Sequence, residues 1–170
     1  MGANDHGESS NGDPCKPLWK RLWHLHLLAK IKVFAWRACV NGLPTMEAIF
    51  RRGISQDMAC PVCGNDAESV DHALLRCDFS SLVWDFWLEN PLHTQGFKNS
   101  FLDSALFILS HSTLQDLEIF FATAWAIWSN RNNILHKDGG LSPSHVWHRA
   151  RNVVEEFTCS ASWEFDFVRP

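Results

Sequence analysis

The stretch that decides the fold reads Cys60-Pro-Val-Cys63, then His72 after eight residues, then Cys77 after four more. Three thiolates and one imidazole form a complete tetrahedral ligand set for Zn²⁺. The two-residue gap lets Cys60 and Cys63 bind one ion from a single tight turn, behind which Gly64 can adopt a positive φ. Because four protein ligands leave no open coordination position, the pattern predicts one structural zinc ion and no catalytic metal.

The alternative interpretation is that these four residues are unrelated core thiols, a surface thiol and a capping histidine. Two features disfavour it: no other pair of the six cysteines is close in sequence, and the intervening residues are too polar for an ordinary core. These polar residues are Gly64, Asn65, Asp66, Glu68 and Asp71. We expect Ser69-Val70-Asp71 to begin a short helix that carries His72, with Cys77 just past its end.

Composition places the chain among globular proteins. It has 170 residues, 46% of them hydrophobic and 20% charged, which is enough for one real core. The cysteine density is far below that of a disulfide scaffold and no signal peptide is visible, so we expect an intracellular protein, nuclear or cytoplasmic, and not a secreted one. No apolar run is long enough to span a membrane, and no membrane partner is expected.

The net charge of −4 hides an asymmetry along the chain. Residues 15–60 carry eight Lys and Arg against two acids, whereas residues 61–128 carry nine acids against two bases. A basic segment suits a surface that faces phosphates, and an acidic one does not. The sequence therefore favours the N-terminal half as the part that would contact a nucleic acid.

Apolar spacing predicts helices before the cysteine cluster. Residues 1–14 are polar and are expected to form a disordered tail. A first helix follows Pro17, with Trp19, Leu22 and Trp23 on its apolar stripe. A second runs from about residue 30 to 40 and a third from Thr45, as N-cap, to about residue 52, where Gly53 ends it. The second helix buries Ile31, Phe34, Ala35 and Ala38.

Helices are also predicted after the cluster. One extends from residue 78 to about 89 with Val83, Phe86 and Trp87 buried, and residues 91–100 form a loop. Helices over 101–109 and about 114–136 follow, and the polar run 130–133 suggests an exposed or fraying end. Ser142-Pro143 begins a last helix that ends near residue 158. The tail, 159–170, shows a short strand-like alternation around residues 163–167.

These elements predict a mainly α fold: a small helical domain with an inserted Cys-Cys-His-Cys zinc knuckle, followed by a C-terminal helical hairpin. We divide the chain into a tail (1–14), a zinc-binding domain (15–90), a loop (91–100), a helical region (101–158) and a C-terminal tail (159–170).

Several motifs occur in a fixed order across residues 17–88: Trp23, Lys30-Ile-Lys-Val-Phe-Ala-Trp36-Arg37, Leu43-Pro44-Thr45, Arg51-Arg52-Gly53, the cysteine-histidine cluster and Trp84. In this order they resemble the reverse-transcriptase zinc-binding domain of plant LINE-type (non-LTR) retroelement proteins. The resemblance implies Cys60, Cys63, His72 and Cys77 as zinc ligands, with no departure from the pattern. Residues 118–158 more loosely resemble the connector towards an RNase H-like domain.

The catalytic residues of such proteins are missing from this chain. There is no Asp-Asp pair of the kind that a polymerase would show, and the chain reaches Pro170 without an RNase H-like carboxylate cluster. The resemblance therefore implies a non-catalytic module with no small-molecule substrate. Its expected partners are RNA or DNA, together with a reverse transcriptase or another retroelement protein.

The candidate contacts to nucleic acid are basic residues interleaved with tryptophans before the cluster. We single out Lys30, Lys32, Arg37, Arg51 and Arg52, because cations beside aromatic rings suit phosphate neutralisation and base stacking. The alternative is that the tryptophans are core residues and the cations only solvate helix faces. A second function therefore competes with nucleic-acid binding, namely a zinc-stabilised structural or protein-interaction domain.

Two histidine pairs are weaker candidates for metal sites. His24 and His26 would share a face on a strand, and His145 and His148 are three residues apart on the last predicted helix. Neither pair has a third ligand in an obvious position, so we interpret all four as surface or capping residues.

Overall fold

The computed structural model describes residues 13–93 and 99–166, and in this part of the chain the protein is mainly helical, as predicted. Most of the predicted tail 1–14 and half of the predicted loop 91–100 lie outside the described residues. The elements are α1 (Lys16–Leu22), α2 (Ala29–Cys39), α3 (Met46–Arg51), the π-helix η1 (His72–Arg76), α4 (Asp78–Trp84), α5 (Phe101–His111), α6 (Leu114–Leu135) and α7 (Pro143–Asp166).

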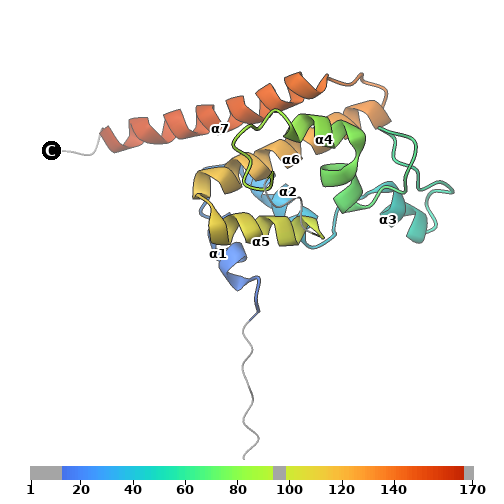
Figure 1. Ribbon diagram of the computed structural model, residues 1–170, viewed down its shortest axis with the longest axis horizontal. Coiled ribbons are helices and arrows are strands. Elements are labelled where there is room, and N and C mark those ends of the chain that lie inside the picture. Colours follow the sequence, from blue (N-terminus) through green and yellow to red (C-terminus); the bar gives the residue numbers. More distant parts are fainter. Residues whose placement is uncertain (1–12, 94–98, 167–170) are drawn as a thin grey trace, which may run out of the picture.

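Helix α6 occupies the centre of the molecule (Figure 1). It contacts α2, α4, α5, α7 and η1, and its residues from Leu117 to Ala124 are all buried. A helix that is apolar on most sides must be covered by neighbours on most sides, which explains this position. Neither α6 nor any other helix in the described part of the chain is long and apolar enough to cross a membrane.

The predicted C-terminal hairpin is formed by α6 and α7, which lie side by side (Figure 1). Pro143 is the first residue of α7, where its missing N–H costs no hydrogen bond. The helix continues to Asp166, so the predicted end near residue 158 and the strand-like tail are wrong. A strand needs a partner, whereas a helix already begun gains one backbone hydrogen bond for each added residue.

Aromatic rings join the two halves of the chain in one core. Trp84 of α4 stacks on Phe120 of α6 with ring centroids 5.3 Å apart, and Phe101 of α5 lies 4.9 Å from the same ring. Trp87 stacks on Trp147 of α7 at 6.4 Å. The hydrophobic core accordingly runs from Leu18 in α1 to Val154 in α7. The domain boundaries at residues 90 and 101 stay a prediction.

The helices before the cluster follow the predicted pattern, with one correction. The apolar face of α2 is buried as expected, and Thr45 caps α3 by accepting a hydrogen bond from the Ala48 N–H. In α1, however, Leu18 and Leu22 are buried while Trp23 is exposed, so Trp23 does not belong to the buried stripe. The reason is that the buried face of α1 is set by Leu18 and Leu22, one turn apart, and Trp23, which still has helical φ and ψ, lies about 100° further round the helix than Leu22.

The helix after the cluster is shorter than predicted. Helix α4 ends at Trp84, and tighter turns follow, in which the N–H groups of Phe86 and Trp87 donate to carbonyls three residues back. This change of pitch brings Trp87 onto Trp147 and leaves Phe86 exposed. The prediction that Phe86 is buried is therefore wrong.

Candidate metal centre

The four predicted ligands converge on one point. One ligand atom from each of Cys60, Cys63, His72 and Cys77 lies within 4.8 Å of all the others. The Cys60 and Cys77 sulfurs are 4.0 Å apart, and the Cys63 sulfur is 3.3 Å from His72 Nε2. A tetrahedron around Zn²⁺ with Zn–S bonds of about 2.3 Å has edges of about 3.8 Å, so the arrangement fits zinc. The thiols are free, because a disulfide would need sulfurs about 2 Å apart.

A short turn supplies the first two ligands. The Gly64 N–H donates to the Cys60 carbonyl and the Cys60 N–H donates to the Asp66 carbonyl, both at 2.8 Å. Gly64 has a φ of 73°, a conformation that glycine adopts without steric cost. An isolated bridge between Ala59 and Ala67 closes the base of this hairpin. Cys60 is thus buried against the protein while Cys63 lies nearer the surface.

A π-helical turn supplies the other two ligands. In an α-helix, residues five apart point about 140° away from each other and could not bind the same ion. Here the Cys77 N–H donates to the His72 carbonyl at 2.8 Å, the five-residue hydrogen bond of a π-turn. The wider turn brings residues five apart back to the same side. The four-residue gap between His72 and Cys77 therefore lets both side chains reach one ion only because the segment forms the π-helical turn η1.

Helix α4 holds this turn in place. The Ser80 hydroxyl donates to the Ala73 carbonyl at 2.6 Å, and the Trp84 indole N–H donates to the Leu74 carbonyl at 2.8 Å. Both carbonyls belong to η1, whose irregular ladder leaves acceptors that need partners when they are buried. Trp84 thus contributes a hydrogen bond to the turn as well as a stacked ring to the core.

The surroundings of the ligands also favour a cation. The hydrogen bond that Cys77 donates lowers the pKa of Cys60, while the same bond, together with burial, raises the pKa of Cys77. One thiolate is thus formed easily beside a thiol that resists ionisation, and a bound Zn²⁺ would compensate the second negative charge. Asp66 lies 3.9 Å from His72 Nδ1, on the side of the ring away from Cys63. A carboxylate at that position favours the tautomer whose Nε2 faces the metal.

A buried ion pair ties the knuckle to α6. One edge of the Arg131 guanidinium, through its Nε and Nη2 N–H groups, donates to both oxygens of the Glu68 carboxylate, and Glu68 and Arg131 are 0% and 3% exposed. Glu68 also accepts a hydrogen bond from the Met46 N–H, and the Arg131 guanidinium lies 4.7 Å from the centre of the Trp128 ring. The prediction that the polar run 130–133 is exposed is wrong, because Asn130 and Arg131 are buried, and the Glu68 carboxylate neutralises the Arg131 charge.

The sequence reasoning thus missed three residues that shape the centre: Asp66, Glu68 and Arg131. A signal for Arg131 was present, since it falls three residues after Trp128 on the apolar stripe of α6. A charged residue at such a position needs a buried partner. Nothing in the sequence identified Glu68 as that partner, because 63 residues separate the two.

The five basic residues singled out from the sequence fall into two groups. Lys30, Lys32 and Arg37 belong to α2, while Arg51 and Arg52 end α3 at a different place in the molecule (Figure 1). Three of the five bond within the protein: Arg37 donates twice to the Gly42 carbonyl, Lys32 donates to the Trp23 carbonyl, and Arg51 pairs with Glu47 one turn back. The role of these residues in nucleic-acid contact stays a prediction.

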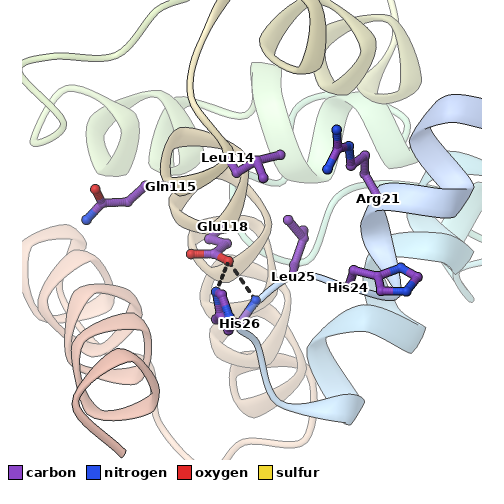
Figure 2. Close-up of a pocket in the computed structure, with 7 residues that line it drawn as sticks. All are labelled: Arg21, His24, Leu25, His26, Leu114, Gln115 and Glu118. Atoms are coloured by element: carbon purple, nitrogen blue, oxygen red, sulfur yellow. Dashed lines mark hydrogen bonds and ion pairs between the residues drawn. The ribbon is translucent and has the colours of Figure 1, made fainter. Parts of the chain in front are cut away.

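A cavity of about 330 Å³ lies between α1 and the start of α6 (Figure 2). Its Glu118 carboxylate accepts a hydrogen bond from the His26 N–H at 2.6 Å and lies 3.5 Å from His26 Nδ1. His24 points away and contacts the Lys20 carbonyl (Figure 2). The two histidines therefore do not converge, and His145 contacts Ser142 instead of a metal-ligand group.

A comparison with known protein families supports the assignment of a zinc site. Residues 7–84 match the family described as "zinc-binding in reverse transcriptase". The match ends with the last residue of α4, so it contains all four ligands and none of α5, α6 and α7. No curated protein and no solved structure matches the chain.

Proposed function

We propose that this chain is a non-catalytic, zinc-stabilised module that binds single-stranded RNA or DNA. The order of its motifs further supports descent from a non-LTR retroelement reverse transcriptase of the kind found in plants. Cys60, Cys63, His72 and Cys77 would hold one zinc ion, whose contribution is structural support. A polymerase on another chain, or another retroelement protein, would act on the bound strand.

The observation that carries the proposal is a pair of exposed tryptophans, Trp23 and Trp36, with the lysine Lys32 close to both in the structure. Trp23 and Trp36 are 48% and 44% exposed, although indole is the largest apolar side chain. The Lys32 ammonium donates to the Trp23 carbonyl at 3.0 Å, and Trp36 follows Lys32 by one turn of α2. Aromatic faces beside a cation suit stacking of unpaired bases with neutralisation of the adjoining phosphates.

The rest of the exposed face of α2 is consistent with this role. Val33 and Val40 lie along it, exposed to a similar degree as the tryptophans, and Lys30 and Arg37 border it. No acidic residue occurs in α2 itself. Acidic residues are instead frequent in the sequence after the cluster, where Asp85 and Glu89 flank the exposed Phe86.

The test is binding of the zinc-loaded chain to single-stranded RNA and DNA, measured by fluorescence anisotropy over a salt series. We expect log Kd to rise linearly with log salt, with a slope of about 0.7 for each phosphate contact. Trp36→Ala should weaken binding by about 1–3 kcal/mol, the range for one stacked base.

Phe86→Ala is the matched control, because Phe86 is 45% exposed, nearly the same as Trp36, but lies among acidic residues. It should leave Kd unchanged. If the zinc-loaded chain bound neither nucleic acid at low salt, the proposal would be wrong, and the zinc-stabilised protein-interaction domain would be the remaining function.

A further inference from the structure

A second basic surface is formed where α2, α6 and α7 meet. Helix α6 lies between the other two (Figure 1), and Trp125 is its only half-buried residue between Leu117 and Trp128. The Lys30 ammonium of α2 lies 4.8 Å from the centre of the Trp125 ring, and the Arg149 guanidinium of α7 lies 5.3 Å from it. Residues far apart in the sequence thus place two cations over one indole.

Among the described residues, these two cations have no carboxylate to neutralise them. Arg131, Arg51 and Arg151 each pair with a glutamate, whereas neither Lys30 nor Arg149 has an acidic partner in the described part of the chain. Glu118, two turns before Trp125 on α6, is buried and already bonded to His26 (Figure 2). The two charges lie within about one Debye length of each other at 0.1 M salt, so they repel.

An anion placed between the two cations would be attracted to both and would offset their mutual repulsion. The indole holds both cations by cation–π contact, so they are kept near each other before any ligand arrives. Because cations already lie over it, Trp125 is poorly suited to stack on a base, unlike Trp23 and Trp36. The surface therefore fits the backbone of a nucleic acid better than its bases.

We propose that Lys30 and Arg149, held over Trp125, bind phosphodiester groups of the nucleic acid, so that α7 is part of the binding surface. This inference rests on the proposed function and extends it. Lys30 belongs to α2, which also carries Lys32 and Trp36, so one strand can contact both places. The binding surface then reaches beyond residues 7–84, into the part of the chain that the family match leaves out.

The structure offers a matched pair of arginines for the test. Arg149 and Arg151 are two residues apart on α7, but Arg151 pairs with Glu155 and lies over Trp147 on the flank next to α4. We would compare the zinc-loaded full chain with Arg149→Gln, Lys30→Gln and Arg151→Gln. The probes are oligouridylate and oligodeoxythymidylate of about 20 nucleotides, longer than the site of a single small domain.

Arg149→Gln and Lys30→Gln should each weaken binding at low salt by about threefold to tenfold and lower the salt slope by about 0.7. The loss should be the same for both probes, because the phosphates are shared. Arg151→Gln should change neither quantity. Equal zinc content and melting temperature in the variants would exclude misfolding as the cause.

The inference is overturned if Arg149→Gln and Arg151→Gln bind alike, or if the loss is confined to one probe. In that event the proposed function still stands, provided that the unaltered chain binds and Trp36→Ala weakens it. Absence of binding by the unaltered chain would instead refute the proposed function, and this inference with it.

Discussion

At the scale of single residues, the four ligands differ in how far each is buried. Cys60, His72 and Cys77 are buried, while the Cys63 side chain is partly open to solvent. A substitution at Cys63 therefore disturbs little packing of its own. Any loss of zinc in such a variant reports on coordination and not on a damaged core.

We predict that Cys63→Ser lowers zinc content from one equivalent to well below one, because serine is a poor ligand for zinc compared with a thiolate. Cys15→Ser is the control, since Cys15 is also a partly exposed free thiol but lies outside the cluster. Metal analysis after gel filtration measures both. One full equivalent of zinc in Cys63→Ser would refute the assignment of Cys63 as a ligand.

At the scale of elements, the knuckle is held by contacts that come from other helices. Met46 at the start of α3 and Arg131 near the end of α6 both bond to Glu68, and α4 bonds to the carbonyls of η1. Zinc and these contacts restrain the same short segment. The metal centre therefore depends on α6, although α6 contributes no ligand.

We predict that Arg131→Met destabilises the zinc-loaded protein by about 3–5 kcal/mol, because it leaves the buried Glu68 carboxylate without its cationic partner. The double variant Glu68→Gln with Arg131→Met should lose less, since no buried charge remains. Urea denaturation followed by tryptophan fluorescence gives the free energies of unfolding.

Arg151→Met tests whether the effect depends on burial. Its partner Glu155 lies one turn away on α7 and both side chains are partly exposed, so the expected loss is below about 1 kcal/mol. Equal losses in Arg131→Met and Arg151→Met would contradict the structural role that we assign to the Glu68–Arg131 pair.

At the scale of the whole molecule, zinc binding is connected to the common core. Ala73, Leu74 and Leu75 of η1 are buried in the same core as α2, α5, α6 and α7. Loss of the metal should therefore also loosen the packing of residues outside the knuckle. The aromatic contacts among α4, α5, α6 and α7 do not involve the ligands and can persist without it.

We predict that a chelator abolishes hydrogen-exchange protection over residues 58–77 and reduces, without abolishing, protection in α6 around Arg131. Before η1, the regular backbone pairing of this segment is a single isolated bridge between Ala59 and Ala67, and metal binding and folding are coupled in such segments. Exchange measured by mass spectrometry with and without chelator tests this. Unchanged exchange in α6 would mean that the knuckle folds independently of the hairpin.

The sequence alone was sufficient to predict local features of this protein. The spacing of Cys60, Cys63, His72 and Cys77 identified the cluster, and apolar periodicity placed most of α2, α3 and α6 within a few residues. Caps such as Thr45 could be predicted because the interaction joins residues three apart. Such features depend on neighbours in the chain, which the sequence displays directly.

Tertiary structure decided what depends on residues distant in the chain. The burial of Glu68 against Arg131, the exposure of Trp23 and Trp36, and the meeting of Lys30 with Arg149 over Trp125 all needed the packed helices. A lone charged or aromatic residue has the same local pattern whether it is paired in the core or exposed on the surface. Whether such a residue is buried or exposed depends on its contact partner, which can come from any part of the chain and is known only from the folded structure.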